Sequence, residues 1–384
     1  MHEIWGMAAL WIGLALLATL LSIWFRIATA LSEIVVGTVA QLIIGALIGA
    51  SLGADAPWIK FLSGTGAIVL TFLAGAELDP VVFKAKLKEV TLIGFISFLA
   101  PFLGCTAAAY YLLGWTVPAS WLAGVALSTT SVAVVYAVML ELGLNTTDFG
   151  KAILAACFIT DLGTVLALGL IFAPFSFKTL VFVGVSAVVL FLLPTITPWF
   201  FKKYGGRPSE LEAKYLLFFL FGLGSLAVWS ESEAVLPAYI IGMVLAGTVG
   251  KDHVLIRRLR TLTFGFLTPF YFIRAGSYVS IQALFATPFA LLVLFFAKIF
   301  AKIIGVYPAT RFCKYSQKEG IYTTLLMSTG LTFGSISALF GLSHNIIDQQ
   351  QYSVLVFVVI GSAVVPTLIA NAFFIPRYLL PKMK

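Results

Sequence analysis

Residues 155–165 read Ala-Ala-Cys-Phe-Ile-Thr-Asp-Leu-Gly-Thr-Val and place one carboxylate, Asp161, inside an apolar stretch that runs from about Phe149 to Phe172. At about 1.5 Å per residue, a helix of this length crosses a bilayer, and Asp161 then lies close to the membrane midplane. An ionised carboxylate at that depth costs about 2.5–3.5 kcal/mol on insertion scales, so such a residue usually faces the protein interior and marks an ion or proton pathway. The alternative is a carboxylate that a lysine neutralises for structural reasons alone. Among the other acidic residues, only Glu77 is expected to approach the interior of a span.

The composition excludes an ordinary soluble domain. Of the 384 residues, 61% are hydrophobic and only 10% are charged, and the mean hydropathy is +1.05. The apolar runs are long and continuous, whereas the strands of a membrane β-barrel alternate in polarity. The sequence therefore predicts an all-α polytopic membrane protein. The net charge of +8 does not indicate a nucleic-acid partner, because the basic residues lie mostly in short loops between apolar runs.

The apolar segments number about thirteen, and each is long enough to be a transmembrane helix. Outside these segments, Lys and Arg concentrate in alternate loops, and only Lys60 and Lys178 fall on the opposite side. Basic loops remain in the cytoplasm, which places the N-terminus outside, the C-terminus in the cytoplasm, and the protein in the cell (inner) membrane. The segments cover approximately 5–26, 34–52, 61–78, 90–113, 119–140, 150–172, 178–201, 213–230, 233–250, 262–279, 286–309, 319–341 and 352–376.

An internal repeat is visible in the sequence. Residues 32–36 read Ser-Glu-Ile-Val-Val, and residues 232–236 return as Ser-Glu-Ala-Val-Leu; residues 73–78 are echoed in the same order by residues 273–278. Repeats of this kind are typical of secondary transporters. The pattern predicts two inverted six-helix repeats joined by a linker helix.

The fifth span of each repeat carries a polar or glycine interruption at mid-depth. Residues 128–132 read Ser-Thr-Thr-Ser-Val, and residues 328–335 read Ser-Thr-Gly-Leu-Thr-Phe-Gly-Ser. Unwound helix at membrane depth is tolerated where it is buried or lines a cavity, and its carbonyl and hydroxyl oxygens suit small cations. The alternative is that the Ser and Thr hydroxyls bond back to the preceding turn and that Gly allows close helix packing. Because the interruptions fall at matching positions in the two repeats, two discontinuous helices that cross in the core are favoured. The candidate cation ligands are Thr129, Thr130 and Ser131, and the candidate helix-break residues are Thr332 and Gly334.

Three basic residues lie within predicted spans. Lys298 and Lys302 are four residues apart and share a helix face, where two unpaired ammonium groups repel. At least one of them is therefore expected to face a carboxylate or a backbone dipole, or to be partly deprotonated by desolvation. Lys302 and Lys298 are the candidate charge-compensating residues, and the alternative for Lys302 is that it snorkels to the interface. Arg274 is either a structural anchor or a partner of Glu77.

Several of these motifs resemble the monovalent cation:proton antiporter superfamily, in the branch of Kef-type potassium efflux and NapA-type sodium/proton antiporters. Residues 70–79 (Leu-Thr-Phe-Leu-Ala-Gly-Ala-Glu-Leu-Asp) are similar to one motif of that family, and residues 127–134 are similar to its interrupted helix. Further along, Asp161 and the Lys-x-x-Gly signal of residues 302–305 fit the same pattern. The resemblance covers nearly the whole chain.

The resemblance implies a homodimer in which a scaffold carries a mobile core, and it makes Asp161 the residue where a monovalent cation and a proton compete. Electrogenic sodium relatives have a second Asp where this chain has Thr160, which we expect to serve as a neutral ligand. The expected division is scaffold spans of repeat one with the first core span at 1–115, core spans of repeat one at 116–175, the linker helix at 176–205, scaffold spans of repeat two at 206–285, and core spans of repeat two at 286–384.

The sequence thus predicts a secondary active transporter that exchanges Na⁺ or K⁺ for H⁺ by alternating access, in electroneutral fashion, within a lipid bilayer. The alternative is an anion or organic-solute symporter of similar architecture, in which Arg274 or Lys302 binds a carboxylate. No cofactor and no enzymatic activity are expected, because the three histidines, His2, His253 and His344, lie in loops or at a terminus.

Overall fold

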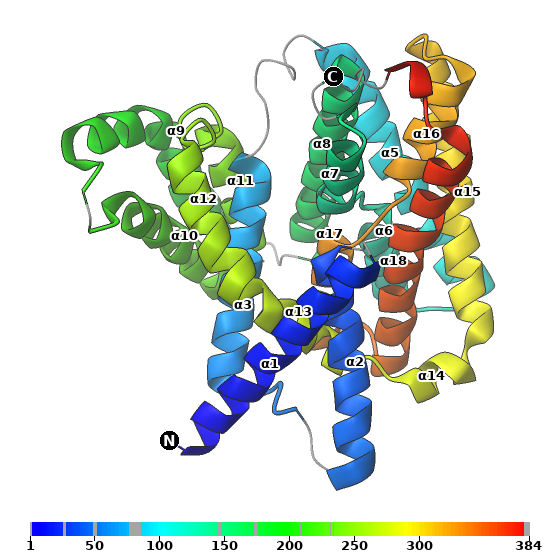
Figure 1. Cartoon of the computed structure of the whole chain (residues 1–384), viewed down its shortest axis with the longest axis horizontal. Coiled ribbons are helices and arrows are strands. Elements are labelled where there is room, and N and C mark those ends of the chain that lie inside the picture. The colour runs from blue at the N-terminus through cyan, green and yellow to red at the C-terminus, as the bar shows by residue number, and fades with distance from the viewer. Residues whose placement is uncertain are drawn as a thin grey trace. The chain divides into compact units, whose positions relative to one another are not determined.

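The computed structural model describes residues 2–25, 28–48, 52–76, 86–144, 147–172, 176–207, 209–230, 232 and 234–379. Every regular element within these ranges is a helix, and nine of the helices there are long and apolar enough to cross a membrane (Figure 1). The prediction of an all-α polytopic membrane protein is confirmed. The number of spans and the inverted repeat remain predictions.

The first compact unit comprises Met1–Leu16, Ile43–Pro80 and Val165–Arg274. Its most extensive helix contact joins α3 (Pro57–Ala76) to α11 (Val235–Leu245), and α10 (Leu211–Trp229) lies beside α9 (Phe177–Tyr204) (Figure 1). A hydrophobic cluster that includes Phe72, Leu220 and Ile241 fills the space between these helices. The unit also contains α12 (His253–Leu262), the π-helical turn η3 (Thr263–Leu267) and most of α13 (Thr268–Ser277).

Helix α12 begins before the apolar segment that the sequence predicts at 262–279. Asp252 caps it, because the side-chain oxygen accepts hydrogen bonds from the backbone N–H groups of Val254 and Leu255. The helix is strongly amphipathic, with Leu255, Ile256 and Leu259 buried. The sequence does not predict an apolar segment here because α12 contains three arginines, at 257, 258 and 260.

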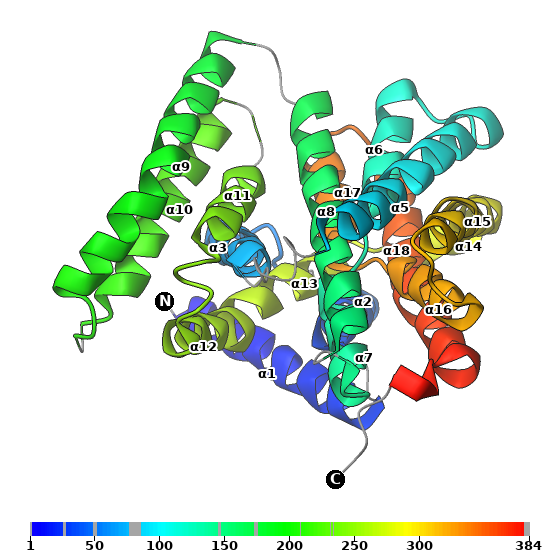
Figure 2. The same ribbon diagram turned by 90° about the horizontal axis from the view of Figure 1, so that it is seen from above.

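The second unit comprises Leu17–Leu42, Val81–Thr164 and Ala275–Lys384. Within it, α5 (Leu87–Ala107) packs against α15 (Pro288–Phe312) and α6 (Val117–Ser128) (Figure 2). Four helices have residues in both units, namely α13 and α1 (His2–Phe25), α2 (Thr29–Ile48) and α8 (Asp148–Phe172). The remaining elements of the second unit are η1 (Ala108–Leu112), α7 (Val132–Glu141), α14 (Ile281–Ala286), α16 (Gln317–Met327), α17 (Thr332–Ser343), α18 (Gln349–Ile369), η4 (Ala370–Phe374) and η5 (Arg377–Leu379).

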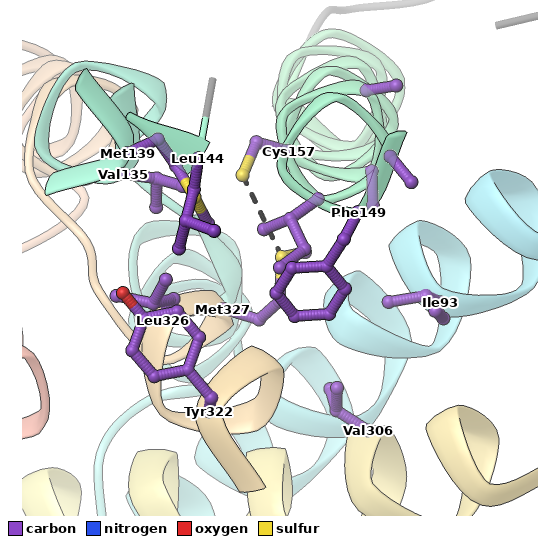
Figure 3. Packing of buried hydrophobic residues seen from close by; sticks show 14 of the residues in the cluster. Ile93, Val135, Met139, Leu144, Phe149, Cys157, Val306, Tyr322, Leu326 and Met327 are labelled. Carbon is purple, nitrogen blue, oxygen red and sulfur yellow. Dashed lines mark hydrogen bonds between the residues drawn. The ribbon is translucent and has the colours of Figure 1, made fainter. Parts of the chain in front are cut away.

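A dense apolar cluster fills the second unit between α5, α7, α8 and α16. Figure 3 shows Phe149 and Cys157 of α8 pointing toward Tyr322 and Met327 of α16. The Cys157 thiol donates to the Met327 sulfur across 3.7 Å. Because its buried side chains come from α15 as well as from these four helices, the cluster fixes the position of α8 one turn before Asp161.

Two sequence motifs cannot be followed in the structure. Glu77 and Asp79, which carry the first family-like motif, lie outside the described residues, as does Glu233 of the internal repeat.

Candidate functional site

Both predicted helix interruptions are present, and they meet inside the second unit. Helix α6 ends at Ser128 and α7 begins at Val132, while α16 ends at Met327 and α17 begins at Thr332. The backbone N–H of Ser131 donates to the carbonyl oxygen of Thr329 across 3.0 Å. The prediction of two discontinuous helices is confirmed.

The side chain of Thr130 makes a second link between the two breaks. Its hydroxyl donates to the Met327 carbonyl oxygen across 2.8 Å and accepts a hydrogen bond from Lys302 Nζ. The last carbonyl groups of a helix carry no partner within the helix. The first break therefore supplies donors to the carbonyl groups at the end of α16.

The Lys302 ammonium lies at the C-terminal end of α6, the helix that precedes the first break. It donates to the carbonyl oxygen of Ser128 at 3.0 Å, to Thr130 Oγ1 at 3.0 Å and to Ser97 Oγ at 2.8 Å. An ammonium has three N–H donors, so these three acceptors use all of them. The positive charge lies against the negative end of the α6 dipole. The side chain is 0% exposed, which excludes snorkelling.

Lys298 lies one helical turn earlier on α15 and is also 0% exposed. Its ammonium donates to Ser362 Oγ of α18 across 2.9 Å. The ammonium also fills the space where a residue other than glycine at position 330 would carry its side chain, since a Cβ there would lie 2.3 Å from Lys298 Nζ. The two lysines thus serve different breaks, Lys302 the first and Lys298 the second.

Asp161 lies on α8 and is 2% exposed. Its Oδ1 atom is buried and has no hydrogen-bond partner among the described residues. Buried polar atoms are nearly always hydrogen-bonded, and an ionised carboxylate that lacks a donor is costly. A bound proton or a bound cation would satisfy this oxygen.

Thr160 and Thr164 attach this part of α8 to its neighbours. The Thr160 hydroxyl lies 3.2 Å from the carbonyl oxygen of Gly94 on α5 and 3.1 Å from that of Ala156. The Thr164 hydroxyl contacts Ser128 Oγ at 3.3 Å, so α8 also touches the end of α6. In this structure, therefore, the hydroxyl proton of Thr160 is used in hydrogen bonds to backbone carbonyl oxygens. Only the lone pairs of the hydroxyl oxygen remain to bind a cation.

The other predicted ligands also make local hydrogen bonds. Thr129 Oγ1 lies 3.4 Å from the Ala126 carbonyl oxygen, and Ser131 Oγ accepts from the Val134 N–H at 3.3 Å, which caps α7. Both residues are buried in the first break. The second break lies just before the residues predicted for it, because Thr332 is already the first residue of α17 and Gly334 lies in its first turn.

Ser97 and Ser362, which accept hydrogen bonds from Lys302 and Lys298, are not among the site residues predicted from the sequence. Each serine is flanked by apolar residues within its helix, a pattern that usually indicates a hydroxyl bonded to the preceding turn. Ser362 does also donate to the Val359 carbonyl oxygen, across 2.9 Å. Only the packing of α5 and α18 against α15 reveals the second role.

One expectation about the acidic residues was wrong. The apolar segment predicted at 34–52 leaves Glu33 just outside the span, but α2 begins at Thr29, and the Glu33 side chain is 2% exposed. Asp161 is therefore not the only buried carboxylate among the residues that the structure describes. Arg274 donates through Nε to the carbonyl oxygen of Ala54 at 2.9 Å, as a structural anchor would.

Comparison with known proteins gives consistent matches over nearly the whole chain. Residues 12–375 match the family described as "Sodium/hydrogen exchanger, transmembrane". A Methanocaldococcus jannaschii protein named "Probable Na(+)/H(+) antiporter 3" is 24% identical over 379 residues, 93% of this chain and 96% of the other. The Na(+)/H(+) antiporter of Enterococcus hirae is 25% identical over 353 residues, 87% of this chain and 91% of the other.

Among solved structures, the sodium proton antiporter MjNhaP1 from Methanocaldococcus jannaschii at pH 8 is similar to this chain with a TM-score of 0.71. The match covers 97% of each chain at 18% sequence identity. At this identity the likeness establishes the fold.

Proposed function

The chain belongs to the transmembrane sodium/hydrogen exchanger family, and we propose that it exchanges a monovalent cation for protons across the membrane at Asp161. The observation that carries the proposal is the buried Oδ1 atom of Asp161, which has no hydrogen-bond partner in the described part of the chain. The names of the relatives, which are Na⁺/H⁺ antiporters, make Na⁺ the first ion to test. K⁺ is the second.

In the proposed mechanism, Asp161 holds either a proton or a cation, and never both. One carboxylate that must be neutralised in a buried site has these two options, and exclusive occupancy couples the two fluxes. The site opens alternately to the two sides of the membrane. Oxygens of Thr160 and of the first break, at Thr129, Thr130 and Ser131, would complete the shell around the cation, because hard cations prefer oxygen ligands.

Lys302 and Lys298 compensate charge in this mechanism. Lys302 lies against the C-terminal end of α6, where its ammonium donates to the carbonyl oxygen of Ser128. Because its three donors are used by Ser97, Ser128 and Thr130, it does not satisfy the carboxylate in this structure. The carboxylate stays available to the transported ions.

We further propose that the protein is a homodimer of the cell (inner) membrane, with its N-terminus outside and its C-terminus in the cytoplasm. The orientation rests on the basic residues, which concentrate in alternate loops. Division of each protomer into a scaffold and a mobile core, with the boundaries given above, is part of the same proposal.

The test uses purified protein in proteoliposomes under a pH gradient, with a pH-sensitive dye inside and Na⁺, K⁺ or Li⁺ added in turn. Exchange predicts that an added cation dissipates the gradient. Uptake of an organic anion or solute without any proton release would instead favour a symporter. Unitary currents in a planar bilayer would indicate a channel.

Exchange is expected to be electroneutral, with one proton moved for one cation, because Thr160 beside Asp161 carries no charge. A carboxylate pair can carry two protons against one cation and so moves net charge, whereas one carboxylate exchanges one positive charge for another. Moving one net charge through 100 mV is worth about 2.3 kcal/mol, roughly a fiftyfold change in an equilibrium gradient.

The measurement is the reversal point of proton flux in proteoliposomes clamped at several membrane potentials. A reversal point that depends only on the cation and proton gradients fits electroneutral exchange. A shift of the reversal point with voltage would mean that a second group, with Lys302 the first candidate, also releases a proton in the cycle.

A further inference from the structure

A groove lies between the C-terminal part of α5 and the first turns of α6, both in the second unit. It is lined by Leu103 and Ala107 from α5 and by Val117 and Trp121 from α6. Its volume is about 460 Å³, which falls within the range of ligand pockets, about 300–1,000 Å³. We call it the α5–α6 groove.

The π-helical turn η1, which continues α5, adds two tyrosines to the lining of the groove. The backbone N–H of Leu113 donates to the carbonyl oxygen of Ala108, five residues earlier, across 3.2 Å. Tyr110 and Tyr111 of this turn are 45% and 80% exposed, and their rings lie 5.0 Å apart. Exposed tyrosines at the end of a span are typical of the membrane–water interface. The groove therefore runs from the edge of the bilayer toward its interior.

The length of the groove matches one leaflet of the bilayer. Helix α5 and η1 together form a candidate membrane span, Leu87–Leu112. Leu103 and Tyr111 are eight residues apart, which is about 12 Å along a helix at about 1.5 Å per residue. The hydrocarbon core of a bilayer is about 30 Å thick, so each leaflet contributes about 15 Å. A lipid chain that lies along the span can therefore follow the groove over most of its length.

The chemistry of the lining suits a hydrocarbon chain. None of the residues that line the groove is charged. The Thr106 hydroxyl donates to the carbonyl oxygen of Phe102 across 2.7 Å, and the Ser120 hydroxyl donates to that of Trp115 across 3.3 Å. Because both hydroxyl protons are used within the protein, only the tyrosines at the edge keep an O–H group for a ligand. A polar solute would find few partners in this groove.

Packing behind the groove holds its wall in place. The ring of Trp121 lies 5.3 Å from that of Phe102, which stacks at 5.3 Å on Phe98. Phe98 in turn packs against Gly163 of α8, since a Cβ at Gly163 would lie 2.7 Å from the Phe98 ring. Well-packed aromatic side chains of this kind keep their positions whether or not a ligand is present. The stack also connects the groove to the helix that carries Asp161.

We propose that the α5–α6 groove binds one acyl chain of a membrane phospholipid. In a bilayer, van der Waals packing drives apolar association, and a concave wall gives a chain more contacts than a flat helix face does. The groove is continuous with the outer surface of the span, where Leu103 and Val117 are 51% and 53% exposed. Lipid chains are the molecules that cover such a surface in a multi-pass membrane protein. The inference is independent of which ions the protein exchanges.

The test uses the full chain in phosphatidylcholine vesicles that contain a small fraction of a phosphatidylcholine with a diazirine on one acyl chain. Irradiation attaches this chain to the side chains that it touches, and peptide mass spectrometry locates the label. Ser120 is 1% exposed and Trp121 is only partly exposed, so a chain reaches them by entering the groove. Label on Ser120 and Trp121 is expected in the wild-type protein.

The variant for the test is Ala107→Trp, which fills the groove from an exposed position on α5. It is expected to reduce the label on Ser120 and Trp121 several-fold and to leave the label on Phe95 unchanged, because Phe95 is exposed on α5 outside the groove. Thr91→Trp is the matched control, since it adds the same side chain at another exposed position of α5. It is expected to be labelled like the wild-type protein.

Size-exclusion chromatography and thermal unfolding show whether each variant is folded. If Ala107→Trp does not fold, the same comparison is made with Ala107→Phe, whose side chain is smaller. Label on Ser120 and Trp121 that is no greater in the wild-type protein than in the folded variant would overturn the proposal. That result would hold equally if another copy of the chain covered the groove or if the groove stayed empty.

Discussion

Replacing Asp161 with asparagine is expected to abolish cation-driven proton movement while the protein still folds and keeps the oligomeric state of the wild-type protein. The carboxamide has nearly the same shape as the carboxylate but cannot release a proton at physiological pH. Because Asp161 Oδ1 has no hydrogen-bond partner among the described residues, the substitution breaks no hydrogen bond at that atom. The loss of activity should therefore not come with a loss of fold.

The measurement is dye-reported proton flux in proteoliposomes, with size-exclusion chromatography and thermal unfolding as tests of fold and assembly. Asp148→Asn is the matched control, because it removes an exposed carboxylate from the first turn of the same helix, α8. It is expected to leave exchange intact and to cost at most about 1 kcal/mol of stability. Substantial exchange by Asp161→Asn would remove Asp161 from its central role.

Replacing Lys302 with alanine is expected to have the second largest effect, and a larger one than replacing Lys298 with alanine. The Lys302 ammonium donates to Ser97, Ser128 and Thr130, and its loss leaves three buried acceptors short of a donor. Each such group costs about 1–3 kcal/mol. The negative end of the α6 dipole also loses its counter-charge.

Lys298→Ala is the comparison, since it lies one turn away, is equally buried, and loses one hydrogen bond, to Ser362. Thermal unfolding in detergent and proton flux in proteoliposomes are measured for both variants. Lys302→Ala should show the lower unfolding temperature and the lower flux. Equal tolerance of the two substitutions would show that the three hydrogen bonds of Lys302 do not organise the site.

The elements of the site that come from a continuous stretch of chain could be predicted from the sequence. The burial of Asp161 is expected from the long apolar run around it, and the two breaks are expected from the polar residues at 128–131 and 328–330. Both are local signals. The apolar length of a span and the polarity of its centre can be read without knowing what the helix packs against.

The partners of each polar side chain could not be predicted in the same way. Ser97 and Lys302 are separated by 205 positions in the chain, and nothing in the sequence around Ser97 differs from an ordinary helical serine. The same holds for Gly330, whose missing side chain makes space for the Lys298 ammonium. Glu33 was misplaced because hydropathy marks where an apolar run begins, while α2 begins several residues earlier.

The most direct test of the central claim, that a cation and a proton compete for Asp161, is proton release on cation binding to the purified protein. The protein is kept in detergent in weakly buffered solution with a pH indicator, and NaCl is added, with choline chloride as the control salt. We predict that Na⁺ releases protons from the wild-type protein near neutral pH and releases none from Asp161→Asn. Proton release of the same size from both proteins, or Na⁺ binding to the wild-type protein without any release between pH 6 and 9, would contradict the claim.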